Sequence, residues 1–147
     1  MPKIMVIYYS RTGNTKRMAE LITEGARTVP GTEVKLVPIT DLNYREAEMA
    51  DALALGSPEY FSYVAGALKI FFDNVLDNAK FKEKPCIAFG THGGGAKVLS
   101  VIEKLADAVG LKQIRKGLQV YGNPVGRQED ECRKLGQDLA RAVTSTS

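Results

Sequence analysis

VIYYSRTGNTK, at residues 6–16, is the stretch that decides the fold. It joins an apolar strand to a helix through a hydroxyl-rich loop that contains one glycine. A turn of this kind aims backbone N–H groups and hydroxyls at one point ahead of a helix N-terminus, where the helix dipole favours negative charge. We therefore predict a phosphate-binding loop at residues 10–15, with oriented N–H and O–H groups as its main donors. The alternative is a Ser/Thr-rich helix cap without a ligand, because hydroxyl residues are ordinary helix starters.

Two common phosphate-binding fingerprints do not fit this chain. A P-loop needs a Gly, four residues and then Gly-Lys-Ser/Thr, and a dinucleotide-binding turn needs Gly-x-Gly-x-x-Gly. Residues 90–97 come nearest to the first pattern, but Ala96 intrudes before Lys97, and Val98 stands where Ser or Thr is required. We therefore do not expect a nucleoside triphosphatase.

Strand and helix patterns alternate along the chain. Apolar strand patterns recur at residues 3–9, 33–39, 52–56, 85–90 and 117–122, and helical patterns fill the intervals, weakly near residues 44–49. The alternation predicts an α/β fold with three layers, a five-stranded parallel sheet covered by helices on both faces. The second and fifth strands contain polar Lys35 and Gln119, so they belong at the edges. Right-handed crossovers then give the strand order 2-1-3-4-5.

The loop at residues 10–15 resembles the phosphate loop of flavodoxins, T/S-x-T-G-x-T, which binds the 5′-phosphate of FMN in that family. The resemblance covers nearly the whole chain in order and spacing. It implies a flavodoxin-like domain with non-covalent FMN at the switch point between the first and third strands. The phosphate ligands that it implies are Ser10, Arg11, Thr12, Gly13, Asn14 and Thr15.

The loop after the third strand is rich in aromatic residues. Tyr60, Phe61 and Tyr63 offer flat apolar surfaces against which an isoalloxazine ring could stack or pack by its edge. Pro58 and its small neighbours favour an irregular loop here. The alternative is that the aromatic side chains fold back onto the core. The flavin contacts predicted in this loop are Ser57, Pro58, Glu59, Tyr60, Phe61 and Ser62.

The loop after the fourth strand is rich in glycine, which lets a backbone pass close to a planar ring and donate N–H groups to it. The flavin contacts predicted here are Thr91, His92, Gly93, Gly94 and Gly95. His92 is also a candidate catalytic proton donor, because imidazole titrates near neutrality. The alternative is a hydrogen-bonded structural histidine. Glu59 is a weaker candidate, either a solvated carboxylate or a group that holds the proton of the reduced flavin.

Three segments point toward one branch of the family. Gly-Ser-Pro at 56–58, Ala-Gly-x-x-Lys-x-Phe-x-Asp at 65–73 and the glycine-rich segment 91–95 resemble multimeric flavodoxins of the WrbA type. Those proteins act as NAD(P)H:quinone oxidoreductases. This chain lacks the extra segments that build their tetramer, which puts both tetramerisation and efficient quinone reduction in question.

Composition limits the partners and the location. A chain of 147 residues with 44% hydrophobic residues fits a single compact domain over residues 1–147. No apolar run approaches the roughly 20 residues that a membrane helix needs, and no signal-peptide pattern is present, so we expect a cytoplasmic protein without a membrane interaction. Cys86 and Cys132 lack a C-x-x-C or His/Cys cluster, so neither a metal site nor a redox disulfide is expected. The net charge of +3 is small and evenly spread, which argues against nucleic-acid binding.

The leading functional interpretation is an electron carrier between redox partner proteins, in which FMN supplies the redox chemistry. Carrier flavodoxins are strongly acidic, whereas this chain is slightly basic, so we expect a different docking surface or an acidic partner of the ferredoxin or reductase type. One alternative is a WrbA-like NAD(P)H:quinone oxidoreductase, and another is an FMN-free interaction module. We expect a monomer or a small homo-oligomer.

Overall fold

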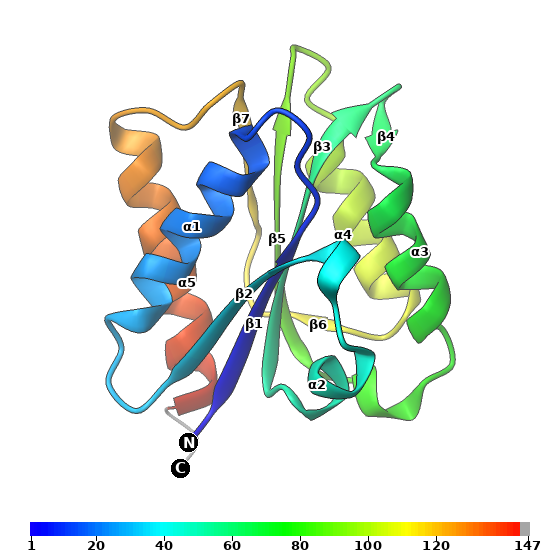
Figure 1. Cartoon of the computed structure of the whole chain (residues 1–147), viewed down its shortest axis with the longest axis vertical. Helices are drawn as coiled ribbons and strands as arrows, with labels where there is room; N and C mark the ends of the chain where they lie inside the picture. Colours follow the sequence, from blue (N-terminus) through cyan, green and yellow to red (C-terminus); the bar gives the residue numbers. More distant parts are fainter. Residues whose placement is uncertain (145–147) are drawn as a thin grey trace.

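The computed structural model describes residues 1–144 and shows strands and helices in alternation (Figure 1). The strands are β1 (Lys3–Tyr8), β2 (Glu33–Pro38), β3 (Ala52–Tyr60), β4 (Tyr63–Val64), β5 (Pro85–His92), β6 (Lys112–Gln113) and β7 (Leu118–Tyr121). The α-helices are α1 (Asn14–Arg27), α2 (Tyr44–Met49), α3 (Gly66–Val75), α4 (Val98–Ala108) and α5 (Arg127–Thr144). Two 3₁₀ turns, η1 (Ile39–Asp41) and η2 (Ala79–Phe81), complete the described elements.

The sheet has the predicted order. Its strands run β2-β1-β3-β5, and both β6 and β7 pair in parallel with the outer edge of β5. The fifth predicted strand is β7, so the predicted order 2-1-3-4-5 is confirmed, and β6 is an additional short strand on the same edge. Since all these strands are parallel, their carboxyl ends meet at one end of the molecule, the upper end in Figure 1.

The third strand is longer than predicted. It continues from Gly56 to Tyr60 and then turns back into β4, which pairs with it antiparallel. The expectation of an irregular loop from Ser57 onward was wrong. Strand β1 ends opposite Gly56, but β3 continues to pair with β5 on its other side as far as Pro58. A proline is tolerated where one side of a strand is free, since its missing N–H is not needed there. Phe61 and Ser62 form the turn with φ of 54° and 63°.

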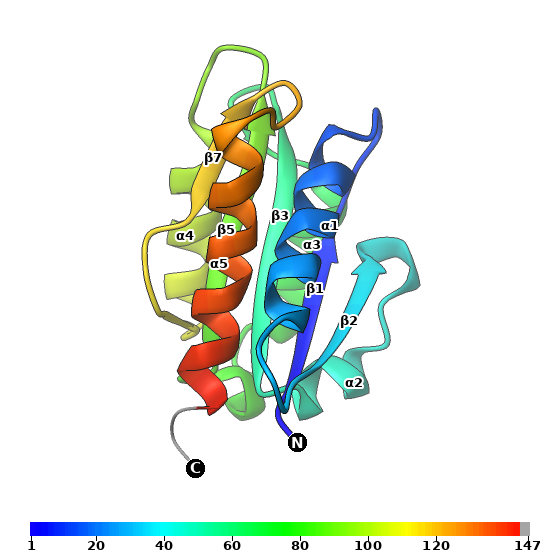
Figure 2. The ribbon, with the colours of Figure 1, turned by 90° about the vertical axis from the view of Figure 1, so that its left-hand side faces the viewer.

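The helices cover both faces of the sheet, as predicted. Helices α1 and α5 pack on one face, and α2, α3 and α4 pack on the other (Figures 1 and 2). Successive residues of β1 alternate between the two apolar layers: Ile4 and Val6 face α1 and α5, whereas Met5 and Ile7 face the opposite layer. This alternation explains why the central strands are apolar along their whole length.

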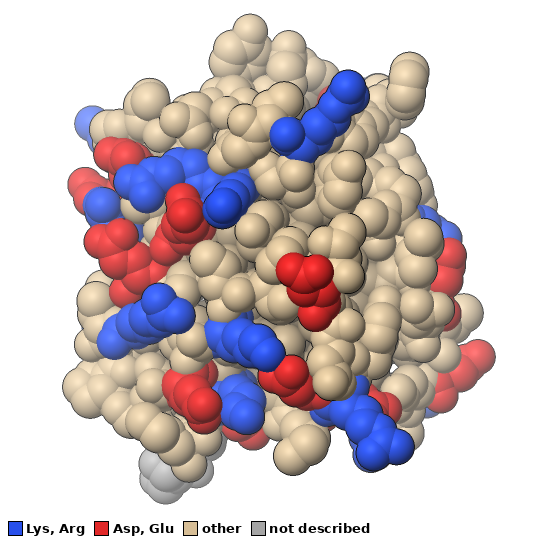
Figure 3. Space-filling model, viewed as in Figure 1, with Lys and Arg blue, Asp and Glu red and all other residues tan. Residues whose placement is uncertain are grey.

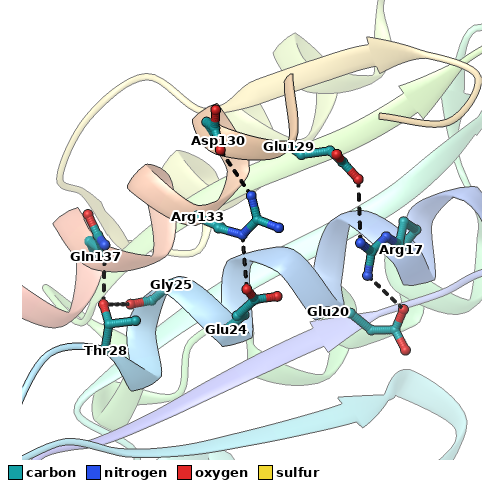
Figure 4. A network of polar contacts seen from close by, with 9 residues as sticks. All are labelled: Arg17, Glu20, Glu24, Gly25, Thr28, Glu129, Asp130, Arg133 and Gln137. Atoms are coloured by element: carbon teal, nitrogen blue, oxygen red, sulfur yellow. Dashed lines mark hydrogen bonds and ion pairs between the residues drawn. The ribbon is translucent and has the colours of Figure 1, made fainter. Parts of the chain in front are cut away.

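Helices α1 and α5 approach each other closely. A Cβ atom on Gly25 would lie 1.9 Å from the carbonyl oxygen of Arg133, and one on Gly136 would lie 2.0 Å from that of Ile22. At this crossing Arg133 pairs with Glu24 at 3.0 Å, and nearer the N-terminal ends of the two helices Arg17 pairs with Glu129 at 3.4 Å (Figure 4). The crossing therefore fixes α1, and with it the loop that precedes α1, against the last helix.

The short helix α2, weak in the sequence pattern, is held at both ends. The Asn43 side chain accepts hydrogen bonds from the N–H groups of Arg45 and Glu46. At the other end, the Lys84 ammonium donates to the carbonyl oxygens of Glu48, at 2.9 Å, and Ala50. Burial lowers the pKa of Lys84, and the charges of Asp51 and Glu48 partly oppose this shift. These tertiary contacts thus stabilise a helix whose own sequence pattern is weak.

The two cysteines lie in different layers of the core. Cys86 belongs to the layer with α3 and α4, and Cys132 belongs to the layer with α1 and α5. Both are free thiols, and burial raises the pKa of each to about 12. Neither is therefore a reactive thiolate at neutral pH.

Candidate functional site

A cavity opens at the carboxyl ends of the strands. Its volume is about 440 Å³, within the roughly 300–1,000 Å³ typical of small-molecule sites. Segments from four places in the chain form its walls, and the lining residues are Arg11, Thr12, Asn14, Pro58, Glu59, Tyr60, Thr91, His92, Gly93, Tyr121 and Gly122. The cavity therefore joins the predicted phosphate loop to the carboxyl ends of β3, β5 and β7.

The phosphate loop has the backbone geometry of an anion site. Gly13 caps α1 in the left-handed conformation, with φ of 98°, which an L side chain rarely adopts. Its N–H donates to the Ser10 hydroxyl oxygen at 3.1 Å, which closes the turn. Gly13 has no side chain to cap the helix, so the first-turn amides of α1 stay available to an acceptor outside the helix. Together with the helix dipole, these donors favour an anion such as a phosphate.

A buried pair of hydroxyls connects this loop to the carboxyl end of β5. The Thr15 and Thr91 hydroxyl oxygens lie 2.8 Å apart, and either one can donate. Both side chains are almost completely buried. Thr12 is exposed instead and lines the cavity. The two threonines of the loop thus occupy different environments.

The end of β3 and its turn form one wall of the cavity. Tyr60 lines it and makes an edge contact with Tyr9, with ring centroids 6.4 Å apart. Burial raises the pKa of Tyr60, Tyr9 adds to this effect, and the positive charge of Arg11 opposes it. Phe61 is fully exposed and lies outside the cavity lining. Tyr60 is therefore the aromatic residue of this segment that the structure brings to the site.

The Ser57 hydroxyl makes two local hydrogen bonds. Its hydroxyl accepts a hydrogen bond from the N–H of Ala65 at 2.8 Å and donates to the carbonyl of Pro58 at 2.7 Å. These bonds join the end of β3 to the start of α3. Ser57 and Ser62 lie outside the cavity lining.

The glycine-rich loop after β5 forms the opposite wall. His92 lines the cavity, and its Nδ1 accepts the N–H of Gly94 at 3.1 Å. Because Nδ1 accepts, the neutral imidazole carries its proton on Nε2. Gly93 also lines the cavity, whereas Gly94 and Gly95 lie farther along the exposed loop.

Tyr121 is a lining residue that the sequence reasoning missed. Its ring meets His92 edge-on, with centroids 6.0 Å apart, and its side chain is largely exposed. Gly122, also missed, donates its N–H to the carbonyl of His92 at 2.9 Å. A signal was present: an aromatic residue followed by Gly-Asn-Pro at the carboxyl end of a predicted strand marks a loop at the same edge of the sheet.

The carboxylate of Glu59 does not point freely into solvent. Its Oε1 accepts hydrogen bonds from the N–H groups of Lys97, at 2.6 Å, and Val98, at 2.7 Å. These are the N-cap and first residues of α4. Glu59 therefore lines the cavity while its carboxylate is engaged by the start of a helix.

Comparison with known proteins decides the family. Residues 6–136 match the family described as Flavodoxin. The chain is 40% identical to a flavodoxin of Aquifex aeolicus (strain VF5), an alignment that covers 97% of this chain and 88% of that one. The chain belongs to the flavodoxin family. A solved flavodoxin structure from the domain Archaea is 28% identical, with a TM-score of 0.90 over 96% of this chain and 98% of that chain.

The flavodoxin family resolves the functional alternatives left open by the sequence. This flavodoxin binds FMN non-covalently and transfers electrons, so the resemblance stated from its loops is confirmed. A WrbA-like protein of Agrobacterium tumefaciens also shares the fold, with a TM-score of 0.86 and full coverage of both chains. At 22% identity, that likeness shows the fold alone. Neither the quinone oxidoreductase nor the FMN-free module is favoured.

The residues present fit FMN. The cavity has the size of a small-molecule site and meets the unobstructed first-turn amides of α1 at the phosphate loop. Tyr60, Tyr121 and the backbone of the glycine loop provide flat, partly apolar walls.

None of the helices in residues 1–144 has the length and apolar character needed to cross a membrane.

Proposed function

We propose that the phosphate of FMN binds at residues 10–15 and that its ring lies between Tyr60 and the segment formed by His92 and Tyr121. The observation that carries this placement is the single cavity that the phosphate loop shares with these residues. Amides and hydroxyls of the loop would hold the phosphate, with Arg11 adding positive charge at the rim. Thr15 would act from a buried position, where its hydroxyl is already oriented by Thr91.

When bound, FMN supplies reversible one- and two-electron chemistry. The chain contributes binding, orientation and partial exclusion of water. Tyr60 and Tyr121 would cover apolar surface of the ring, while the N–H group of Gly93, the glycine of this loop that lines the cavity, would face its polar edge. His92 would offer a proton at Nε2 to a group inside the cavity, because its Nδ1 is used by Gly94.

The rim around the cavity supports an acidic redox partner. Arg11 lines the cavity, Lys16 lies in the first turn of α1 after the phosphate loop, and Lys97 lies at the end of the glycine loop. All three are exposed, and none of them makes an ion pair within residues 1–144. Phe61, Tyr121 and Val125 expose apolar surface nearby. In Figure 3 the upper end of the molecule is mostly uncharged, and its prominent charged side chain is basic. Opposite charges steer partners together, so we propose a partner of the ferredoxin or reductase type with an acidic docking face.

Two measurements test the site and the partner. The wild type should bind FMN much more tightly than riboflavin, which lacks the phosphate, and equal affinities would contradict the phosphate loop. For the partner, Arg11→Glu kept saturated with FMN should slow electron transfer from an acidic ferredoxin at low ionic strength, and added salt should reduce the difference from wild type. Lys80→Glu is the control, since Lys80 lies in η2 at the other end of the molecule. An equal effect of both variants would show that net charge alone matters.

A further inference from the structure

Helix α4 begins without a capping side chain of its own. Its N-cap residue, Lys97, makes no side-chain capping bond. The acceptor comes instead from Glu59, whose Oε1 lies 2.6 Å from the N–H nitrogen of Lys97 and 2.7 Å from that of Val98. A carboxylate in this position satisfies two amides that the helix leaves open and interacts favourably with the helix dipole. The cap therefore joins the end of β3 to the start of α4.

A second side chain holds the same loop from the opposite side. The Gln119 amide donates from Nε2 to the carbonyl of Ala96 at 3.0 Å and accepts at Oε1 from the N–H of Leu99 at 3.3 Å. Ala96 has a φ of 56°, a left-handed conformation that is unusual for a residue with a side chain. Such a conformation persists where surrounding contacts determine it. Glu59 and Gln119 supply those contacts from β3 and β7.

The loop also passes directly over the Glu59 carboxylate. A Cβ atom on Gly95 would lie 2.0 Å from Glu59 Oε2. The glycine at this position therefore lets the loop close onto the carboxylate, and the carboxylate in turn limits where the loop can move.

We propose that Glu59 is a positioning residue, which with Gln119 fixes the glycine loop 93–96 in the form that receives the flavin ring. The proposal rests on the placement of the ring against this loop given above. A loop with three consecutive glycines samples many conformations when it is not held, and ordering it on binding would weaken affinity. Glu59 thus holds one wall of the site in place, and its carboxyl group serves the helix cap rather than proton transfer to the flavin.

This role predicts a particular pattern of ligand affinities. Glu59 acts on the wall for the ring and not on the phosphate loop. Its loss should therefore weaken FMN and riboflavin by the same factor, whereas loss of a phosphate ligand should weaken FMN alone. Gln in place of Glu keeps an amide oxygen that can accept one of the two N–H bonds, so it should restore part of the affinity.

The experiment compares Glu59→Ala, Glu59→Gln and the control Glu46→Gln. Glu46 is a carboxylate in an ion pair with Lys35 at 2.7 Å, next to the edge strand β2 and away from the cavity. Apoproteins are titrated with FMN and with riboflavin, and the visible circular dichroism of each complex is recorded. We expect Glu59→Ala to raise both dissociation constants about tenfold, the effect of losing a helix cap, and to alter the flavin signal. Glu59→Gln should fall between Ala and wild type, and Glu46→Gln should match wild type.

Three results would overturn the proposal. One is a Glu59→Ala protein whose two dissociation constants stay at the wild-type values, and another is a loss confined to FMN. The third is a Glu59→Gln protein as impaired as Glu59→Ala in which the pH dependence of the semiquinone potential is also altered, since that pattern belongs to a proton relay. Far-UV circular dichroism of the apoproteins checks folding, and Glu59→Gln decides the matter if the Ala variant does not fold. Failure of the proposed phosphate site would appear separately, as equal affinity of the wild type for the two flavins.

Discussion

The hydroxyl groups of Thr15 and Thr91 share a buried hydrogen bond of 2.8 Å that connects the first turn of α1 to the end of β5. One partner belongs to the phosphate loop, and the other lies at the end of β5, which leads into the glycine loop proposed to receive the flavin ring. The two parts of the proposed FMN site are thus joined by the protein itself. A substitution of Thr15 should therefore affect the stability of the protein as well as its affinity for FMN.

The two threonines of the phosphate loop should respond differently to Val. Thr12→Val removes an exposed hydroxyl, so we expect a loss of about 1.5–3 kcal/mol in FMN binding with little effect on apoprotein stability. Thr15→Val should cause a similar loss of affinity and, in addition, destabilise the apoprotein by about 1–3 kcal/mol, because Thr91 is left unpaired in the core. Flavin titration and urea unfolding measure the two effects. Thr15→Ser should recover both, and failure to do so would assign the effect to the lost methyl group.

Tyr60 and Tyr121, which line the cavity, should matter more for the flavin than Phe61, which does not. Replacing either tyrosine by Ala exposes part of the ring to water, so the flavin absorption bands should shift and FMN should bind about 0.5–1.5 kcal/mol more weakly. Phe61→Ala serves as the comparison and should keep the wild-type spectrum. If Phe61→Ala instead gave the largest spectral change, the aromatic wall would have to be assigned to the tip of the β3–β4 turn.

The crossing of α1 and α5 should tolerate no added methyl group. Gly25→Ala and Gly136→Ala each place a Cβ atom against backbone, and overpacking of this kind costs about 1–3 kcal/mol or more in the free energy of unfolding. Gly66→Ala is the matched control, since a Cβ atom there has no neighbour within 4 Å. Thermal and urea unfolding of the apoproteins provide the measurement. A Gly25→Ala protein as stable as Gly66→Ala would show that the helices separate easily.

The buried ammonium of Lys84 should make stability depend on alkaline pH. Its pKa is lowered in the folded protein from the ordinary 10.5. Between the lowered value and 10.5 the unfolded chain binds more protons at this residue than the folded one, so the residue's contribution to stability rises with pH in that window. Lys84→Met removes this dependence and leaves the carbonyls of Glu48 and Ala50 without their donor. We expect urea unfolding from neutral pH up to pH 10.5 to show a difference in unfolding free energy between the two proteins that grows in favour of wild type. A difference that stays constant with pH would contradict the lowered pKa of Lys84.

Reduced nicotinamides separate a carrier from a quinone oxidoreductase. An electron carrier has no need to hold a nicotinamide against the ring, so we expect NADPH and NADH to leave the FMN oxidised for minutes in anaerobic stopped-flow mixing. Rapid reduction would contradict this expectation. His92→Ala would then show whether the imidazole donates the proton, because loss of a positioned donor lowers quinone turnover by about 10²-fold or more.

The fold was predictable because its signals are local. Each strand carries its own apolar run, and Lys35 and Gln119 mark the edge strands, so the order followed from sequence and handedness alone. The extension of β3 was not predictable in this way. Whether Pro58 breaks a strand or extends it depends on where the neighbouring strand β1 ends, and that register is set by tertiary packing.

The site was predictable in part, for the same physical reason. The phosphate loop is a contiguous pattern whose geometry is determined within a few residues. The partner of Glu59 lies 38 residues away, and the contact between His92 and Tyr121 joins two different strands. Long-range pairs of this kind leave no periodic signal, so the cap on α4 could not be read from local spacing. For Tyr121, at the end of β7, the local pattern marks a loop at this edge of the sheet but not the contact with His92.

The placement of Cys86 and Cys132 in opposite layers of the core gives this flavodoxin two native reporters of its own motion. A buried thiol with a raised pKa reacts with an alkylating reagent only when its surroundings open. Labelling of Cys86 would then follow the release of α3 and α4, and labelling of Cys132 would follow the release of α1 and α5. Mass spectrometry of the two peptides would show, without any engineered probe, which face of the sheet FMN holds closed.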